Sequence, residues 1–387
     1  MKKRVLIVNK FLYPRGGDCI VALDTCHMLR SRGHEAALWG MDCPGNISAE
    51  FSELFASRVS FSGAGKLRGF ARAMGYVGVR RRFGEMLRRF RPDVVHFHNI
   101  HSYLSPAVVE MAHEFGARTL WTMHDYKLVC PAYTCLRDGR ICTDCLQKSS
   151  AVVRHRCMKG SLAAGIAARA EAAKWNIVRL MKATDVVICP SRCMARVLEQ
   201  GGVPPEKIAV VGNCVTFVAP VAEKGDYYAS FVRLSPEKGI EQLLRVASTL
   251  PFELRVYGRG PLEAELKAKY GSCPNIRFMG QADHSAVAEA MAAAKLTVMP
   301  SVWLENNPLA VMESLTNGAP VAGANIGGIP ELIGPGDGVL FNPSDDLALS
   351  WAIKRLFNFP DDYQAIRSRA LDRFSPERYV AALESLF

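Results

Sequence analysis

The sequence predicts an α/β protein with two domains, each built on a parallel β-sheet covered by helices. Its 387 residues suit two domains of about 150–200 residues each. Short apolar runs such as residues 296–299 are bounded by polar loops, which is typical of parallel strands buried on both faces. Polar or glycine-rich loops follow several of these runs, at the strand ends where open α/β sheets bind their ligands.

The composition indicates a globular protein with a sizeable core. Hydrophobic residues make up 49% of the chain, yet no apolar run approaches the ~20 residues that a membrane-spanning helix needs. The apolar run at residues 5–8 is too short for the core of a signal peptide and reads as a first strand. We therefore expect a cytoplasmic protein.

The net charge of +11 is unevenly distributed. Residues 1–184 carry 29 Lys and Arg against 14 Asp and Glu, and ten of these bases lie in residues 58–91, where Glu85 is the one acid. Large apolar residues alternate with these bases on expected helices, a mixture that suits an anionic membrane surface. The alternative is an ordinary helix pair whose apolar side faces the core. A nucleic-acid surface is disfavoured because no recognised nucleic-acid-binding motif is present.

In the first half, apolar runs predict strands at residues 3–9, 34–41, 93–98, 118–123, 185–189 and 207–211. Helices are expected from the glycine loop to Arg30, over residues 161–182 and after residue 190, whereas residues 44–65 read as irregular. Gly16 and Gly17 follow the first strand, where glycine lets the backbone approach a ligand closely.

Histidines end two strands of this half. His96-Phe97-His98-Asn99 ends one, with His101 close by, and His124-Asp125 ends the next. A metal site is the alternative interpretation, but no acidic ligand follows at a useful spacing. We therefore expect polar active-site lining, with Asn99 and Asp125 as acceptor-side candidates.

Five of the twelve cysteines lie in an insert spanning residues 130–157. Cys142 and Cys145 form a knuckle with two intervening residues, and Cys130 and Cys157 flank it. In a cytoplasmic protein such a cluster favours metal over disulfides, so these four thiols predict a structural zinc site that staples a long loop. Unliganded thiols and an iron–sulfur cluster are the alternatives.

In the second half, a linker at residues 220–226 precedes expected strands at residues 227–232, 252–257, 275–279, 296–299 and 320–324. Residues 327–331 are expected to turn into a helix, and a final helix should run from residue 376 to Phe387. Arg233 and Lys238 lie five residues apart on a turn ahead of a helix. Two cations so placed would clamp a diphosphate and stabilise the charge that grows on it as a leaving group.

The most informative stretch is residues 301–315. Pro308 begins an expected helix and Gly318 ends it, so Glu305 lies in the preceding loop and Glu313 about two turns inside. Unpaired N–H groups at the start of that helix would face an anionic ligand such as a phosphate. One carboxylate would then reach a sugar hydroxyl, and the other a second hydroxylated group.

Glu305, seven residues, Glu313, and then Gly318-x-Pro320-Val321 resemble the donor-site motif of retaining glycosyltransferases of family 4. The resemblance covers nearly the whole chain and implies the GT-B fold, in which two Rossmann-like domains face each other across a cleft. It implies an acceptor-side domain at residues 1–218, a nucleotide-sugar domain at residues 219–370, and a helix at residues 371–387 that packs back on the first domain.

The resemblance also implies roles for individual residues. Arg233 and Lys238 would hold the diphosphate, although Val232 replaces the glycine that precedes this arginine in the family pattern. Glu305 and His124 would contact the donor sugar, and Glu313 would bind the ribose. The remaining donor-side positions would be Gly16, Gly17, Gly258, Asn306, Asn307, Pro308 and Leu309.

The implied reaction moves a sugar from a nucleoside-diphosphate sugar to a hydroxyl, with retention at the anomeric carbon. The expected acceptor is a lipid-linked saccharide of cell-surface polysaccharide synthesis, met at the inner face of the cytoplasmic membrane. The absence of an Asp-x-Asp motif argues against a catalytic metal. The rivals are another GT-B enzyme, such as a phosphorylase or a sugar-nucleotide epimerase, and a basic zinc-containing nucleic-acid binder.

Overall fold

The computed structural model describes residues 1–76, 78–358 and 362–387. Residue 77 of the predicted basic segment and residues 359–361 of the predicted second domain lie outside the described residues. The chain divides into two compact units. Unit 1 comprises Met1–Cys135, Cys142–Gly212 and Tyr379–Phe387, and unit 2 comprises Leu136–Ile141 and Asn213–Arg378.

The sheet of unit 1 has six parallel strands in the order β2-β1-β3-β4-β7-β8. Strand β1 lies between β2 and β3, and its last four residues, Val5 to Val8, are apolar and fully buried. This explains why the first apolar run forms a strand with neighbours on both sides. The strands are β1 (Arg4–Val8), β2 (Glu35–Trp39), β3 (Val94–Phe97), β4 (Arg118–Thr122), β7 (Val186–Cys189) and β8 (Ile208–Val210).

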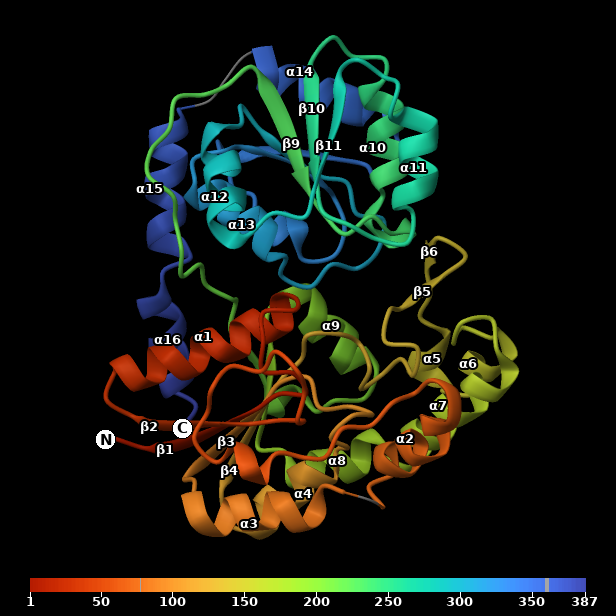
Figure 1. Cartoon of the computed structure of the whole chain (residues 1–387), viewed down its shortest axis with the longest axis vertical. Coiled ribbons are helices and arrows are strands. Elements are labelled where there is room, and N and C mark those ends of the chain that lie inside the picture. Colours follow the sequence, from red (N-terminus) through yellow and green to blue (C-terminus); the bar gives the residue numbers. More distant parts are fainter. Residues whose placement is uncertain (77, 359–361) are drawn as a thin grey trace. The chain divides into compact units, whose positions relative to one another are not determined.

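Helices cover both faces of this sheet: α1 lies on one side of the strands, and α3, α4 and α8 lie on the other (Figure 1). The helices are α1 (Gly17–Ser31), α2 (Lys66–Ala73), α3 (Arg80–Phe90), α4 (Ala107–Glu114), α5 (Asp144–Gln147), α6 (Ala151–Arg154), α7 (Leu162–Lys174), α8 (Ile177–Ala183), α9 (Arg192–Gln200) and α16 (Pro376–Glu384). Short 3₁₀ turns of unit 1 occur at η1 (Ser52–Leu54), η2 (Gly63–Gly65) and η3 (Pro205–Lys207). The two-stranded hairpin of β5 (Leu136–Arg137) and β6 (Arg140–Ile141) is assigned to unit 2, as are the first three residues of α16.

The sheet of unit 2 also has six parallel strands, in the order β11-β10-β9-β12-β13-β14. The chain first adds β10 and β11 on one side of β9. It then returns to the other side of β9, where it adds β12, β13 and β14. That reversal is the switch point at which doubly wound sheets bind nucleotides. The strands are β9 (Tyr227–Phe231), β10 (Glu253–Tyr257), β11 (Ile276–Gly280), β12 (Thr297–Met299), β13 (Val321–Ala324) and β14 (Gly338–Phe341).

Helices α10 and α11 lie on one side of this sheet, and α12 and α13 lie on the other (Figure 1). The helices are α10 (Ile240–Ala247), α11 (Glu263–Tyr270), α12 (His284–Ala293), α13 (Leu309–Thr316), α14 (Asp346–Asn358) and α15 (Tyr363–Arg373), with 3₁₀ turns η4 (Pro236–Lys238) and η5 (Ile329–Glu331). The prediction of two parallel-sheet α/β domains is therefore confirmed.

Two predicted helices were wrong. The helix expected over residues 161–182 is two helices, because Asn176 caps a new one: its side chain accepts a hydrogen bond from the N–H of Arg179. The helix expected after residues 327–331 is only the 3₁₀ turn η5, and strand β14, which the sequence interpretation missed, follows it.

The basic segment resolves into two helices with different surroundings. The apolar side chains of α3 are buried, and the Phe83 ring packs on the Trp39 ring with centroids 4.7 Å apart. That face is core, as the alternative interpretation held. By contrast, Leu67 on α2 is 83% exposed and Tyr76 is 69% exposed.

Candidate active site

The first candidate site lies at the carboxyl ends of β9 and β12, which are neighbours at the switch point of unit 2. The loop after β9 carries Arg233 and Lys238, and the loop after β12 carries Glu305. Helix α13 begins at Leu309 behind the second loop, and no side chain caps its amino end. In its first turn Val311 donates its N–H to the Pro308 carbonyl at 3.1 Å. The N–H groups of Leu309 and Ala310 have no carbonyl partner within the helix and can bind an anion.

The structure brings Lys238 and Glu305 into direct contact. The Lys238 ammonium lies 2.6 Å from Oε1 of Glu305, and the hydroxyl of Ser301 donates a 2.5 Å hydrogen bond to the same oxygen. Glu305 is only 5% exposed. Because both contacts use Oε1, Oε2 has no partner among the described residues and remains able to accept a hydrogen bond from a ligand.

Two glycines allow this arrangement. Gly239, at φ +65°, passes the carbonyl of Pro300 so closely that a Cβ would collide with it. Gly327, at φ +62°, lies against the backbone of Glu305 in the same way, and the next residue donates its N–H to the Glu305 carbonyl at 2.7 Å. The glycine after Lys238 is therefore required by close approach of the two loops.

Arg233 is exposed and has no ion pair with any described residue. Gly258, at the end of β10, has φ +128°, and a Cβ there would collide with the carbonyl of Val232. Gly258 thus holds the ends of β9 and β10 together beside Arg233. The family pattern has glycine where this chain has Val232. The valine side chain does not disturb the close approach of Gly258, because Gly258 lies against the backbone carbonyl of Val232.

The predicted residues around α13 divide into two groups. Glu313 has a side chain that is 16% exposed and lies 3.3 Å from Nε2 of His284 on α12. Asn307 is used internally: its Oδ1 accepts the N–H of Asn213 at 2.9 Å, and its carbonyl accepts the Asn213 side chain at 3.2 Å. The side chain of Asn307 therefore positions the loop, and the N–H groups available to a ligand begin at Leu309, because Pro308 has none.

Sequence reasoning missed two residues of this site. Ser301 shares the Glu305 oxygen with Lys238, and the Lys238 ammonium lies 5.0 Å from the centroid of the Trp303 ring. Both lie in the stretch that the motif covers, but neither belongs to the motif. The sequence did contain a signal for Ser301: it places a hydroxyl four residues before Glu305, within reach of its carboxylate.

The second candidate site lies at the carboxyl ends of β1, β3 and β4 in unit 1. The Asn99 side chain donates to Asp18 at 3.0 Å, and Nδ1 of His98 lies 2.9 Å from Nε2 of His124. Asp18 follows the Gly16-Gly17 loop, so the three strand ends that the sequence singled out do meet. Asp125 turns back instead: its Oδ1 accepts the N–H of Lys127 at 2.8 Å.

Burial holds four histidines of this site, His96, His98, His101 and His124, uncharged. Burial lowers the pKa of His124 to about 4 and that of His96 to about 3, and it lowers the pKa values of His98 and His101 well below the usual range. His124 can therefore offer a neutral imidazole to a ligand at neutral pH. Among the residues that the structure describes, no group of three or more His, Cys, Asp or Glu is arranged to hold a metal ion.

We expect this histidine cluster to make folding acid-sensitive. Below a pH of about 6.5 the unfolded chain binds protons that the folded cluster excludes, so the free energy of unfolding should fall as the pH is lowered from 6.5 toward 5. Urea unfolding at a series of pH values measures this slope. His96→Gln should flatten it, whereas His113→Gln, at a residue with no such cluster, should not. A midpoint that is constant over this range would contradict the assignment.

The cysteine insert brings three of its five thiols together. The Cys130 thiol hydrogen-bonds the thiols of Cys135 and Cys145, so Cys135, which the predicted set omitted, lies beside Cys130. The N–H of Cys142 donates to the Cys135 carbonyl at 2.8 Å. Zinc held by Cys130, Cys142, Cys145 and Cys157 stays a prediction, which metal analysis of the purified protein would test.

No helix in the described parts of the chain combines the length and the hydropathy needed to cross a bilayer.

Two family models match the chain. The model described as Glycosyltransferase Family 4 matches residues 15–217, which is more than half of the chain. The model described as Glycosyl transferases group 1 matches residues 215–373. The boundary between the two matched ranges, near residue 215, lies close to the boundary between units 1 and 2 at residues 212 and 213.

Curated relatives match over parts of the chain. The O-antigen biosynthesis glycosyltransferase WbnH of Escherichia coli is 28% identical over 207 residues, which is 52% of this chain and 60% of that protein. The sulfoquinovosyl transferase SQD2 of Arabidopsis thaliana is 37% identical over 120 residues, 29% of this chain and 23% of that protein. The chain thus spans less than two thirds of the length of these relatives.

Solved structures match over the whole chain. Sucrose-phosphate synthase from Thermosynechococcus elongatus aligns with a TM-score of 0.73 at 18% identity, covering 100% of this chain and 98% of that one. Anabaena Alr3699/HepE, solved in complex with UDP and glucose, aligns with a TM-score of 0.68 at 17% identity and covers 99% of both chains. At such identities the likeness shows the fold alone.

Proposed function

Because this chain belongs to glycosyltransferase family 4, we propose that it transfers a sugar from a nucleoside-diphosphate sugar to a hydroxyl of a lipid-linked saccharide, with retention at the anomeric carbon. The proposed setting is cell-surface polysaccharide synthesis, as the names of the O-antigen relatives suggest. The observation that carries the proposal is the Lys238–Glu305 contact at the switch point of unit 2, beside the uncapped start of α13.

In this proposal the bond between the anomeric carbon and the diphosphate oxygen breaks, and negative charge grows on the diphosphate. Lys238 and Arg233 neutralise that charge, and the first N–H groups of α13 add to their effect. Glu305 keeps Lys238 in position through Oε1 and accepts a sugar hydroxyl at Oε2.

The remaining roles follow the family pattern. We propose that Glu313 binds the ribose and that His124 contacts the transferred sugar as a neutral imidazole. Gly16, Gly17 and Gly258 would allow close backbone approach to the donor. Asn99 would face the acceptor, and Asp125 would contact it through Oδ2, because its Oδ1 accepts the N–H of Lys127. No covalent nucleophile and no catalytic metal are assigned.

The test combines donor binding with turnover. Thermal shift against a panel of nucleoside diphosphates and their sugars, beginning with UDP and UDP-glucose because HepE was solved with them, should identify the donor. Release of the nucleoside diphosphate should then require an acceptor saccharide. A phosphorylase would instead need phosphate, and an epimerase would convert the donor without any acceptor. Binding of DNA or RNA in place of a sugar nucleotide would favour the nucleic-acid rival.

We also propose that unit 1 binds an anionic membrane surface through residues 58–91. Leu67 and Tyr76 are exposed beside a surplus of bases, so both apolar insertion and charge attraction would contribute. Leu67→Gln together with Tyr76→Gln should reduce flotation with anionic vesicles several-fold, at about 1 kcal/mol for each apolar group withdrawn. Leu371→Gln, at an exposed leucine of α15, is the matched control. Equal flotation of wild type and the double variant would contradict the proposal.

A further inference from the structure

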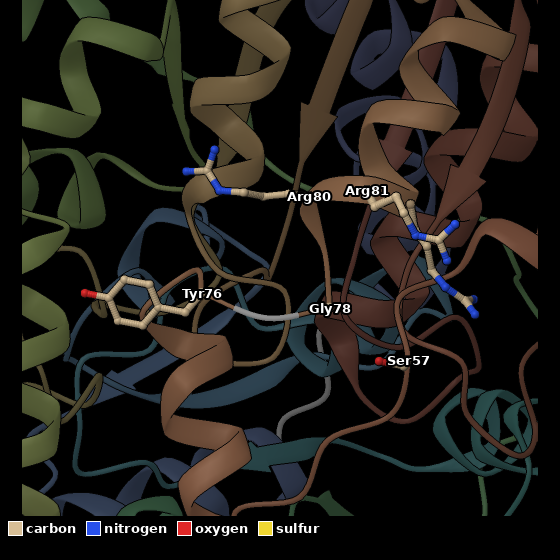
Figure 2. Close-up of a pocket in the computed structure, with 6 residues that line it drawn as sticks. Ser57, Tyr76, Gly78, Arg80 and Arg81 are labelled. Atoms are coloured by element: carbon tan, nitrogen blue, oxygen red, sulfur yellow. The ribbon is translucent and has the colours of Figure 1, made fainter.

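A cavity of about 420 Å³ lies at the amino end of α3 in unit 1 (Figure 2). Its walls come from unit 1 alone, and it is lined by Ser57, Tyr76, Gly78, Arg80, Arg81 and Arg82. The volume falls within the range of small-molecule sites, which is about 300–1,000 Å³. None of the roles proposed above for sugar transfer uses these residues.

The charge at this end of α3 is not balanced by acids. Arg80 and Arg81 have no ion pair with any residue that the structure describes, and the Arg82 guanidinium donates to the carbonyl oxygens of Glu53 and Phe55, at 3.2 and 2.5 Å. The first turn of α3 contains no acidic residue, and no side chain caps it. The helix dipole adds partial positive charge at the same end, where cations are unfavourable.

The other end of the same helix is balanced. The Arg88 guanidinium lies 2.6 Å from Glu85, and the Arg89 guanidinium lies 3.0 Å from Glu85 and 3.1 Å from Glu53. The five arginines of this helix thus divide into two that pair with acids at its carboxyl end and three at the cavity that have no acidic partner among the described residues. An anion in the cavity would remove this imbalance.

A buried guanidinium lies behind the cavity wall. Arg72 is fully buried, and its Nη2 donates to the Ser57 carbonyl at 2.9 Å and to the Ser57 hydroxyl at 3.0 Å. Since that hydroxyl oxygen accepts from Arg72, the O–H of Ser57 remains a donor. Gly78, at φ +76°, leaves room for Arg72, because a Cβ there would collide with the guanidinium.

We propose that this cavity binds a phosphate group carried by a polar molecule the size of a phospholipid headgroup. Arg80 extends on the side of Tyr76, and Arg81 extends on the side of Ser57 (Figure 2). These two side chains extend in opposite directions, so a single ligand that contacts both must be larger than free phosphate (Figure 2). Guanidinium groups, hydroxyls and helix N–H groups are the donors that phosphate oxygens prefer. This inference is independent of the proposed sugar transfer, but Tyr76 and the arginines of the cavity also belong to the proposed membrane surface at residues 58–91.

The experiment measures binding of sn-glycerol 3-phosphate to the full chain by calorimetry at low ionic strength. The test variant is Arg80→Gln with Arg81→Gln, and the matched control is Arg88→Gln with Arg89→Gln, which removes the same charge from the same helix. The test variant should weaken binding by about tenfold or more, since charge-assisted hydrogen bonds are lost, while the control should change it by no more than about twofold.

Vesicles of phosphatidylcholine containing phosphatidic acid distinguish the sources of the phosphate. If they compete with sn-glycerol 3-phosphate, the ligand belongs to the membrane, and if they do not, it is soluble; either result supports the site. Equal weakening by the two arginine pairs would overturn it in favour of diffuse charge attraction, as would absence of binding to the wild type. Unchanged melting temperatures and unchanged nucleoside-diphosphate binding would show that the variants are folded.

Discussion

Replacement of Lys238 by methionine should lower kcat by about 10²- to 10³-fold, the effect typical of removing one preorganised group that stabilises a leaving oxyanion. Lys238 is held at 2.6 Å from Glu305, so its ammonium is already in place before any donor binds. Because such a cation acts mainly on the charge that develops in the transition state, kcat should fall more than the donor affinity does. Steady-state kinetics with the identified donor and acceptor measures both.

The methionine variant has a second consequence that needs its own control. Loss of the ammonium leaves the buried carboxylate of Glu305 without its cation, which should destabilise unit 2 by a few kcal/mol. Combining Lys238→Met with Glu305→Gln removes the unpaired charge, so stability should return while activity does not. If activity returned together with stability, Lys238 would be a structural cation and the assignment would fail.

Glu305→Gln should reduce kcat/KM by about 10²-fold with little change in melting temperature. Glutamine has the same shape and can still accept the Ser301 hydroxyl, but it loses the charge that orients Lys238 and accepts a sugar hydroxyl. Donor hydrolysis and transfer assays should both show the loss, because both need the same sugar contact.

Two other glutamates serve as comparators for this variant. Glu313→Gln should raise the donor KM and leave kcat nearly unchanged, since a ribose contact is the same in the ground and transition states. Glu289→Gln, on the exposed surface of α12, should have no effect. A Glu305→Gln enzyme as active as Glu289→Gln would remove Glu305 from the site.

Much of the fold could be predicted because its determinants are local. A strand that is buried on both faces is mostly apolar, and β1 and β7 therefore appear as short apolar runs with polar boundaries. Helix α9 begins where Ser191 accepts the N–H of Met194, a capping signal that can be read from the residue type. The break between α7 and α8 was missed because residues that favour helices continue on both sides of Asn176, with alanines before it and Leu180, Met181 and Lys182 after it.

The basic segment shows where local pattern is insufficient. Its alternation of arginines and large apolar residues is the same on α2 and α3, but the apolar face of α3 is buried against Trp39, whereas Leu67 of α2 is exposed. An amphipathic pattern predicts that one face of a helix will be buried, but it does not predict whether the protein core or a membrane will bury that face. Only the packed structure separates a core helix from a surface that a membrane could cover.

The sequence by itself determined two parallel-sheet units, the strand ends that carry polar loops, and the identities of Arg233, Lys238, Glu305 and Glu313 as donor-site candidates. Tertiary structure alone decided that Lys238 pairs with a carboxylate 67 residues away and that Ser301 shares it. It also decided that Gly327 must lack a side chain and that Asn307 is used to hold its own loop. The physical reason is strand order: β9 and β12 become neighbours only when the sheet reverses, and no local propensity records which strands will lie side by side.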